Sequence, residues 1–399
     1  MSDPDLDPRP TPPVSDWEEV AAFLARPESH GTSLPISRID THAAVVFLAG
    51  ALAYKIKRPV RFPFLDFSTL ERRATACRRE ICIDRAIAPA IYRRVVPITR
   101  EADGRLAIDG HGTTVEWAVE MNRFDETATL DRLVEKGPLD PLFIDDLADE
   151  IARAQSHARI REAGPWMKDV RGYIEHNRTA FSDRPDLFPP EAAARLHALT
   201  MARWEDAIEL VEDRGRLGRV RVGHGDLHCA NVAMVDGRPQ LFDAIEFDDA
   251  IATGDVLYDV GFLVMDLDVR GDRPAGRRML NRWLQATARV EACGPSLRDT
   301  EEAFLTEVDG LAALPLWLTV RAGLRAKIAA ATAQHLDGEA RADQEALARR
   351  FFAAACGYVE PHKPRLIALG GLSGAGKSTL ARAIASGIVI ESIAYFNCF

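Results

Sequence analysis

The sequence contains few cysteines and no long apolar run. Six cysteines occur in 399 residues, with no CxxC pair and no metal-like spacing to histidine. This pattern predicts reduced thiols and argues against a disulfide scaffold or a cysteine-based metal site. The most apolar stretch, 312–320, is far shorter than the ~20 residues that span a bilayer. We therefore expect no membrane partner.

Excess positive charge and a targeting signal are also missing. Fifty Lys and Arg residues stand against sixty Asp and Glu, giving a net charge of −10. That sign predicts no nucleic-acid partner and favours a cationic substrate. The N-terminal sequence MSDPDLDPRPTPP is acidic and proline-rich, without the basic and apolar regions of a signal peptide. The sequence predicts a cytoplasmic protein.

The remaining pattern predicts a strand-rich half followed by a helical half. After a helix over 16–26, alternating or apolar runs predict strands over 43–49, 51–57, 95–98, 105–109 and 113–121. A long helix is expected over 68–88, with Ser68 as N-cap and Glu71 completing a capping box. From residue 126 to about 359 the apolar spacing is helical, except over 219–247. This order predicts an α+β fold with an antiparallel sheet.

The exception, 219–247, contains residues suited to phosphoryl transfer. The sequence HGDLHCAN places Asp226 five residues before Asn231, the spacing of a kinase catalytic loop. Phosphoryl transfer needs a carboxylate that orients the attacking hydroxyl and oxygen ligands that hold Mg²⁺ against the phosphates. We therefore expect Asp226, Asn231 and Asp243 to be catalytic, with Asn231 and Asp243 as metal ligands.

A hairpin should bring the two metal ligands together. Asp236-Gly237 is a strong two-residue turn signal between the apolar runs 232–235 and 240–242. Folding about it pairs Val235 with Arg238 and Asn231 with Phe242. Asn231 and Asp243 then lie side by side at the open end of the hairpin.

The HGDLHCAN sequence resembles the catalytic loop of aminoglycoside phosphotransferases, choline kinases and related small-molecule kinases. The resemblance implies a protein-kinase-like two-lobed fold that uses ATP and Mg²⁺. It predicts a tail and helix over 1–34, an antiparallel N-lobe with one helix over 35–125 and a helical C-lobe over 126–361. The expected reaction moves the γ-phosphoryl group of ATP to a hydroxyl of a small molecule, whose identity the sequence does not give.

A kinase also needs a strand lysine on the phosphates and a helix glutamate that positions it. Ala-Tyr-Lys at 53–55 has the form of that strand motif, so Lys55 is preferred over Lys57, which shares its face. Glu80, in the middle of the expected helix, is the best partner. The alternative is that these three are solvated charges. Met121 lies where the adenine hinge is expected.

Several further residues allow two interpretations. No G-x-G-x-x-G precedes Lys55, and Ala-Ile follows Asp243, which disfavours a regulated protein kinase. Glu246 could assist the metal, whereas Asp255 and Asp259 are expected to brace the catalytic loop and His228 to pack within it. The cluster of Arg321, Arg325 and Lys327 is interpreted as a solvated helix face, with phosphate reading or an interdomain role as the alternative.

A second nucleotide motif lies near the C-terminus. RLIALGGLSGAGKSTLARAIA, 365–385, contains the P-loop pattern, with Gly371, Gly374, Gly376, Lys377, Ser378 and Thr379 as expected phosphate-binding residues. No Walker B acid follows before Phe399. We therefore expect residues 362–399 to be the first β-loop-α unit of a truncated or frameshifted P-loop domain, without function here.

Together, residues 37–386 resemble a bacterial family that fuses an aminoglycoside-phosphotransferase-like domain to a C-terminal P-loop kinase or ATPase domain. Two other functions stay open. The chain could be a nucleotide-binding pseudokinase with a regulatory role, against which the intact Asp226, Asn231 and Asp243 argue. It could also be a P-loop ATPase whose second domain is incomplete here.

Overall fold

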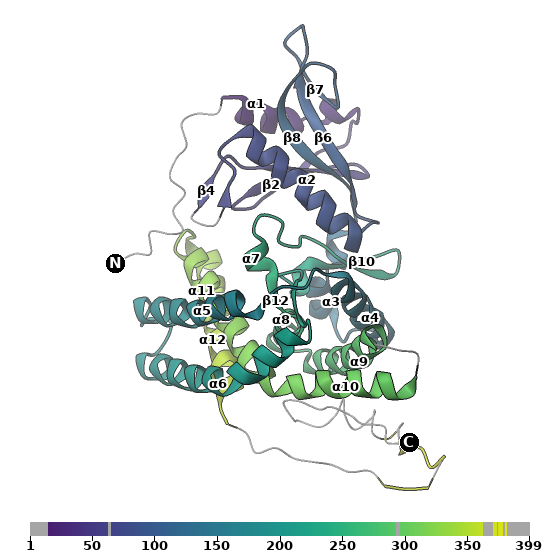
Figure 1. Ribbon diagram of the computed structural model, residues 1–399. Helices are drawn as coiled ribbons and strands as arrows, with labels where there is room; N and C mark the ends of the chain where they lie inside the picture. The colour runs from purple at the N-terminus through teal and green to yellow at the C-terminus, as the bar shows by residue number, and fades with distance from the viewer. Residues whose placement is uncertain are drawn as a thin grey trace. The chain divides into compact units, whose positions relative to one another are not determined.

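The computed structural model describes residues 15–62, 65–292, 296–361, 370–372, 374–377 and 380. The chain divides into two units, and each is described by itself (Figure 1). The sheet unit is Met1–Thr129 together with Asn231–Ala252, and the helical unit is Leu130–Ala230 together with Thr253–Phe399. The predicted boundary at residue 125 lies close to Thr129, and the segment 231–252 groups with the sheet unit.

The sheet unit is built on six strands in the order β1-β2-β3-β8-β6-β7, with every neighbouring pair antiparallel. β2 and β3 are joined by a two-residue turn in which Gly50 has a φ of 61°, a left-handed conformation that glycine adopts without strain. The strands are β1 (Ser37–Asp40), β2 (Ala44–Ala49), β3 (Leu52–Lys57), β6 (Tyr92–Arg100), β7 (Leu106–Ile108) and β8 (Thr113–Asn122).

The two faces of this sheet pack against different helices. Because strand side chains alternate, Phe47 and Ile56 point to the face that packs on α1 (Ser15–Leu24). Ala53 and Val119 point to the opposite face, where Cys77 of α2 (Leu70–Ile87) packs against them. Lys55 has the same parity as Ala53, so β3 directs it toward α2.

The start of α2 differs from the prediction. Its N-cap is Thr69, whose hydroxyl accepts a hydrogen bond from the Arg72 N–H at 3.3 Å. Ser68 instead donates its hydroxyl to Asp66 at 2.6 Å. The predicted cap was therefore wrong by one residue, because both neighbouring residues carry a hydroxyl suited to the position.

The predicted hairpin is confirmed. β10 (Val232–Val235) pairs with β11 (Arg238–Leu241) in antiparallel register, with Val235 opposite Arg238. Asp236 and Gly237 both have positive φ, at 51° and 75°, as a tight two-residue hairpin turn requires. The sheet unit also contains five short elements: β4 (Arg61–Phe62), β5 (Leu65–Asp66), α7 (Asp249–Ala252) and the 3₁₀ turns η1 (Pro27–His30) and η2 (Glu126–Ala128).

The helical unit is organised around two buried helices, α8 (Val256–Val269) and α11 (Leu314–Ala333). Trp317 of α11 is fully buried, and its ring centroid lies 5.4 Å from those of Trp166 and Tyr258. The surrounding helices are α3 (Leu130–Lys136), α4 (Pro141–His157), α5 (Ala163–Asp183), α6 (Pro190–Arg216), α9 (Arg273–Glu291), α10 (Leu297–Gly310) and α12 (Gly338–Val359). The α+β class and the helical second half are thus confirmed.

A small antiparallel sheet interrupts the helices of this unit. β9 (Val220–Val222) pairs with β12 (Thr253–Asp255), and α8 begins at the next residue, Val256. β9 leads directly into the HGDLHCAN loop, which contains the 3₁₀ turn η3 (Cys229–Asn231); a fourth 3₁₀ turn, η4 (Leu311–Ala313), precedes α11. The loop therefore starts from a fixed strand end.

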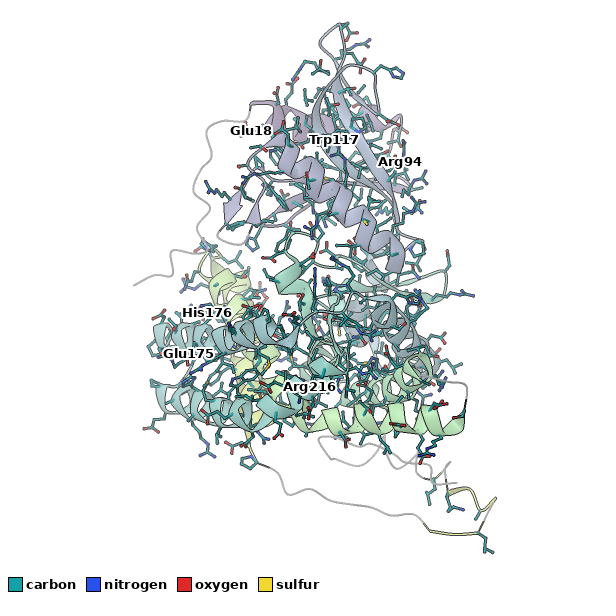
Figure 2. The ribbon with its side chains drawn as sticks, viewed as in Figure 1. Glu18, Arg94, Trp117, Glu175, His176 and Arg216 are labelled. Atoms are coloured by element: carbon teal, nitrogen blue, oxygen red, sulfur yellow. The ribbon has the colours of Figure 1, made fainter. Side chains whose placement is uncertain are left out.

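Charged side chains cover the surface of both units, among them Glu18, Arg94 and Arg216 (Figure 2). Within the described part of the chain, one helical stretch, 298–333, is long and apolar enough to cross a membrane. Over half of its most apolar window is buried inside the protein, as expected for a core helix.

Candidate functional site

The sheet unit contains a cluster of ion pairs around the two lysines of β3. Lys55 Nζ lies 2.9 Å from Glu80 Oε1 and 2.5 Å from Asp243 Oδ1. Lys57 Nζ lies 2.6 Å from Glu80 Oε2 and also pairs with Glu246. The structure therefore brings together the predicted Lys55, Lys57, Glu80 and Asp243, and Glu246 with them.

The two lysines differ in their access to solvent. The Lys57 side chain is 3% exposed and has a buried carboxylate on each side, Glu80 and Glu246. Lys55 contacts Asp243, whose side chain is 49% exposed. Of the two lysines, only Lys55 thus contacts a carboxylate that a ligand can reach. Glu246, considered above as a metal ligand, forms an ion pair with Lys57 instead.

The charges in this cluster stabilise one another. Burial alone would lower the pKa of Lys55, but the carboxylates of Asp243 and Glu80 raise it well above its usual value. Burial alone would raise the pKa of Glu80, but Lys55 and Lys57 hold it below its usual value. Both groups therefore stay charged near neutral pH, as a lysine that binds phosphate requires.

Asn231 and Asp243 lie at the open end of the β10–β11 hairpin. The Phe242 N–H donates to the Asn231 carbonyl oxygen at 3.0 Å, which extends the ladder by one pair, as predicted. Asp243 is the next residue, and its φ of 60° turns the chain away from the strand. Carboxylate and amide oxygens are the ligands that Mg²⁺ prefers.

Met121, the predicted hinge residue, lies near the end of β8. It is buried with Ala53 and Tyr92, which are its register partners on the two neighbouring strands. The chain leaves the strand at Asn122, and the Arg123 N–H donates to the Ala51 carbonyl oxygen at 2.9 Å. Adenine binding by this segment stays a prediction.

The helical unit contains the HGDLHCAN loop up to Ala230. Asp226 Oδ2 lies 3.3 Å from His228 Nε2. Burial by itself would raise the pKa of Asp226, but the hydrogen bond with His228 and the charge of Arg325 hold it below its usual value. Asp226 is therefore a carboxylate at neutral pH, able to accept a hydrogen bond from a hydroxyl.

Two aspartates of α8 hold the backbone of this loop. Asp259 accepts the N–H groups of His224 at 2.9 Å and Gly225 at 3.1 Å. Asp266, seven residues further along the helix, accepts the Cys229 N–H at 3.0 Å. The loop is thus held on both sides of Asp226. The sequence interpretation named Asp259 but missed Asp266, although two acids at heptad spacing in an apolar helix were a visible signal.

Arg321 lies behind Asp259. Its guanidinium carbon is 3.8 Å from the Tyr258 ring centroid and 4.5 Å from that of Phe262, and Nη2 is 3.7 Å from Asp259 Oδ1. The residue is only 5% exposed. The interpretation of Arg321 as part of a solvated helix face was therefore wrong, because α11 is a core helix whose arginine is covered by two aromatic rings.

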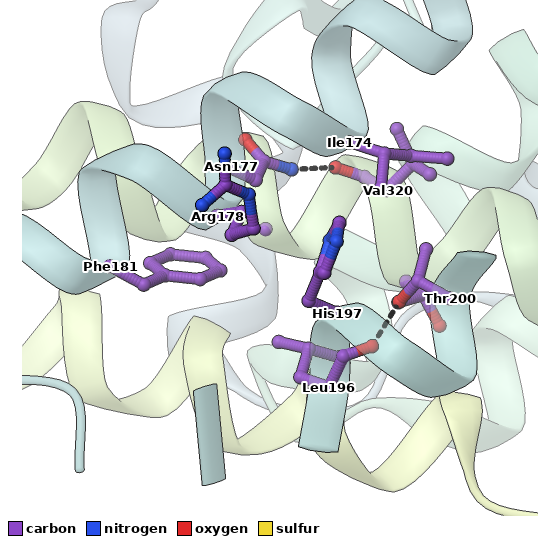
Figure 3. A pocket seen from close by; sticks show the side chains of 10 residues that line it. Ile174, Asn177, Arg178, Phe181, Leu196, His197, Thr200 and Val320 are labelled. Carbon is purple, nitrogen blue, oxygen red and sulfur yellow. Dashed lines mark hydrogen bonds between the residues drawn. The ribbon is translucent and has the colours of Figure 1, made fainter. Parts of the chain in front are cut away.

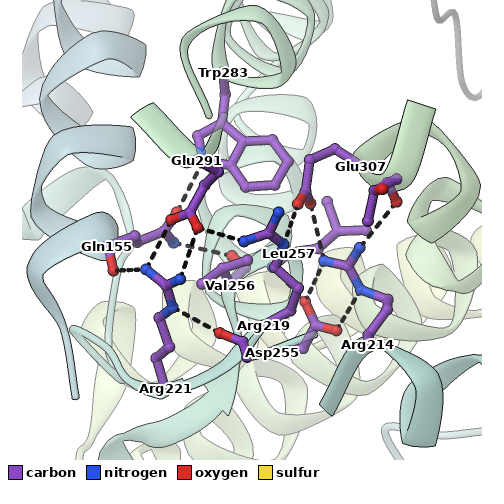
Figure 4. A network of polar contacts seen from close by, with 12 residues as sticks. Gln155, Arg214, Arg219, Arg221, Asp255, Val256, Leu257, Trp283, Glu291 and Glu307 are labelled. Atoms are coloured by element: carbon purple, nitrogen blue, oxygen red, sulfur yellow. Dashed lines mark hydrogen bonds and ion pairs between the residues drawn. The ribbon is translucent and has the colours of Figure 1, made fainter. Parts of the chain in front are cut away.

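Asp255 has a different role from the predicted bracing of the loop. It caps α8 by accepting the Leu257 N–H and forms a bidentate pair with Arg214, at 2.6 and 2.8 Å (Figure 4). Arg214 Nη2 also lies 3.1 Å from Glu307. Two further arginines, Arg219 and Arg221, complete a network that also includes Glu291.

A separate small pocket lies among α5, α6 and α11 (Figure 3). Asn177 Nδ2 donates to the Val320 carbonyl oxygen at 3.4 Å beside it, and His197 also lines it. None of the predicted site residues contributes to its walls.

Of the predicted P-loop, the structure describes Gly371, Gly374, Gly376 and Lys377, whereas Ser378 and Thr379 lie outside the described residues. Gly374 and Gly376 have positive φ, at 78° and 76°. Lys377 Nζ donates to the Leu372 carbonyl oxygen at 2.7 Å, within the same loop. Phosphate binding by this segment stays a prediction.

Comparisons with known proteins give relatives without an assigned function. No family model matches the chain. Uncharacterized proteins of Mycobacterium tuberculosis and Mycobacterium bovis are 29% identical over 350 residues, which is 87% of this chain. The chain spans 64% of the length of these relatives.

Solved structures similar to this chain are small-molecule kinases. A choline kinase from Cryptosporidium parvum has a TM-score of 0.44 at 11% identity, covering 81% of this chain and 88% of its own. An ethanolamine kinase from Plasmodium vivax has 0.45 at 10%, covering 81% and 82%. An ADP-bound aminoglycoside phosphotransferase has 0.35 at 13%, covering 75% and 98%. Below a TM-score of 0.5 such likeness does not carry function, and nothing in these comparisons supports a fused P-loop domain.

Proposed function

We propose that this chain is an ATP-dependent phosphotransferase of the protein-kinase-like type, moving the γ-phosphoryl group of ATP to a hydroxyl of a small molecule. The observation that supports this most is the contact of Lys55 with both Glu80 and Asp243. Kinase chemistry requires this lysine–glutamate pair, because it fixes the lysine that holds the phosphates. The nearby acid, Asp243, follows the hairpin that also presents Asn231.

The donor set fits Mg²⁺. Among the described residues, no group of three or more His, Cys, Asp or Glu side chains is arranged to hold a metal. Mg²⁺ in kinases takes one or two protein ligands and completes its shell with phosphate oxygens and water. Asp243 and Asn231 would supply those protein oxygens. Bound Mg²⁺ would neutralise the charge that develops on the phosphates.

The chain's own residues then have distinct tasks. Lys55, kept charged by Glu80, would bind phosphate oxygens, while Lys57 holds α2 to the segment at Glu246. Asp226 would accept a hydrogen bond from the acceptor hydroxyl and so orient it for attack. The carboxylate form is favoured by His228. The acceptor is a small molecule with a hydroxyl group, and the acidic chain favours a cationic one.

The test is an ADP-release screen of the purified chain against a library of hydroxyl- and amine-bearing metabolites. Asp226→Asn keeps the shape and removes the carboxylate, so we expect kcat to fall by roughly 10²–10⁴-fold, with ATP affinity little changed. Near-normal turnover in Asp226→Asn would refute the assignment. ATP binding without any Asp226-dependent ADP release would instead indicate a nucleotide-binding regulatory module.

A further inference from the structure

The backbone at Asp243 has an uncommon conformation. Its φ of 60° lies in the left-handed region, and the next residue is Ala244. A residue other than glycine pays about 1–3 kcal/mol for such a conformation, which persists only where the surroundings hold it in place. Contacts within the sheet unit must therefore hold the backbone of this turn in place.

Two side chains from separate elements hold the turn. The Asp243 N–H donates to the hydroxyl oxygen of Tyr92 at 3.1 Å, and the Ala244 N–H donates to Asp84 Oδ1 at 2.9 Å. Asp84 is in the last turn of α2, and Tyr92 is the first residue of β6. Since the Phe242 N–H already bonds to Asn231, three successive amides of the turn have fixed acceptors.

Asp84 is a carboxylic acid at a buried position, where an apolar residue would be more usual. It lies one turn after Glu80 on the same face of α2 and is fully buried. Its other oxygen, Oδ2, has no hydrogen-bond partner. Burial raises the pKa of Asp84 well above its usual value, and the charge of Glu80 acts in the same direction. An apolar side chain would avoid this desolvation cost, but it could not accept the Ala244 N–H. The hydrogen bond to Ala244 is therefore what distinguishes the carboxyl group from an apolar side chain at this position.

We infer that Asp84 and Tyr92 are positioning residues for Asp243: they fix the turn 242–244 so that the Asp243 carboxylate is presented beside Lys55. Neither residue touches the nucleotide or the metal in this scheme. The link to metal binding rests on the proposed function, whereas the hold on the turn is a property of the free protein. α2 would thus organise two parts of the cluster, Lys55 through Glu80 and Asp243 through Asp84.

The first experiment follows amide hydrogen exchange of the peptide covering 241–247 in the free protein. Asp84→Leu removes the acceptor, so exchange should rise about three- to tenfold, the range of one hydrogen bond. Asp84→Asn keeps an acceptor oxygen of the same shape and should exchange like the parent. Tyr92→Phe should also raise exchange, whereas Tyr54→Phe, which removes a buried hydroxyl elsewhere in the same sheet, should not.

The second experiment measures the Mg²⁺ concentration needed for half-maximal ATP binding by the same variants. It should rise by a similar factor in Asp84→Leu and be restored in Asp84→Asn, with kcat at saturating Mg²⁺ changed less. Unchanged exchange in a folded Asp84→Leu, or an equal rise in Asp84→Asn, would overturn the inference. Faster exchange with an unchanged Mg²⁺ requirement would refute positioning and leave a structural contact. A parent that binds no ATP-Mg would refute the proposed function alone, since the exchange result still decides whether Asp84 holds the turn.

Discussion

Each unit of this protein contains a cluster of buried ion pairs, and the two clusters are built differently. In the helical unit, Arg214, Arg219 and Arg221 pair with three carboxylates, all of them largely buried. In the sheet unit, two lysines pair with three carboxylates, one of which, Asp243, is half exposed. The first cluster is closed, with charge matched inside it. The second is open at Asp243, whose half-exposed side chain is accessible to solvent.

The difference predicts a structural role for the closed network and, under the proposed function, a chemical role for the open cluster. A closed network gains little net stability over apolar packing, but removing one partner leaves a buried charge uncompensated. An open cluster loses less from the same change, because water reaches the exposed group. A mutation in the closed network should therefore mainly lower stability, whereas a mutation in the open cluster should mainly weaken ligand binding.

The largest expected effect is on the closed network. Arg214→Leu leaves buried Asp255 without its arginine and leaves Glu307 with Arg219 alone. We therefore expect a loss of about 3–5 kcal/mol in the free energy of unfolding, measured by urea denaturation. Arg216→Ala is the matched control, two residues away on the same helix. Its exposed pair with Asp213 should contribute less than ~1 kcal/mol. Equal losses in the two variants would contradict the comparison.

A mutation in the open cluster should mainly change the binding of ATP-Mg. Asp243→Ala removes a full charge from the predicted metal site, so ATP-Mg binding should weaken by about 100-fold, or roughly 2.7 kcal/mol, while the urea midpoint changes little. Asn231→Ala should weaken binding less, because it removes a neutral ligand. Titration calorimetry with and without Mg²⁺ measures both. The interpretation fails if Asp243→Ala binds ATP-Mg as tightly as the parent.

A smaller effect concerns pH. The pKa of Asp226 is held below its usual value, so its carboxylate is lost only as the pH falls through that lowered pKa, and activity should persist into acidic solution. His228→Ala removes a hydrogen bond that lowers this pKa and leaves burial to raise it. The acid limb of the kcat/KM profile should therefore move to higher pH. An acid limb that stays in place, as expected for the control His197→Ala, would contradict this role for His228.

The smallest expected effect is at the C-terminal motif. Lys377 belongs to neither cluster and donates to a carbonyl of its own loop. We expect Lys377→Ala to leave ATP binding and ADP release within about twofold of the parent, a difference below ~0.5 kcal/mol. A large drop in nucleotide affinity would show that the predicted P-loop binds phosphate in this protein.

Patterns of short range could be predicted from the sequence. The alternation in β3 placed Lys55 and Lys57 on one face, and the Asp236-Gly237 turn placed Asn231 opposite Phe242; both are confirmed. The N-cap of α2 was wrong by one residue, because Ser68 and Thr69 are equally suited to it.

Contacts between distant segments could not be predicted. Arg321 looks solvated in a helix with nearby charges, and only the tertiary packing shows Tyr258 and Phe262 covering it. The network around Arg214 joins residues from α6, β9, α9 and α10, which no local pattern connects. Asp84 likewise gave no signal, because its partner is a backbone amide 160 residues away. The roles of Asp226, Asn231 and Asp243 stay predictions that the experiments above test, and adenine binding near Met121 also stays a prediction.

The split of the sheet unit along the chain has a consequence for biosynthesis. Val235 and Phe242 pack against the core of the sheet unit, and Phe247 packs beside Leu65 and Phe67, yet these residues follow Thr129 by more than a hundred positions. At about 5–20 residues per second of translation, the nascent sheet would wait roughly 5–25 s on the ribosome for the strand pair that completes it. During that interval, apolar side chains on its α2-facing side would lack the cover of Val235 and Phe242, and such transiently exposed surface is the kind that chaperones protect.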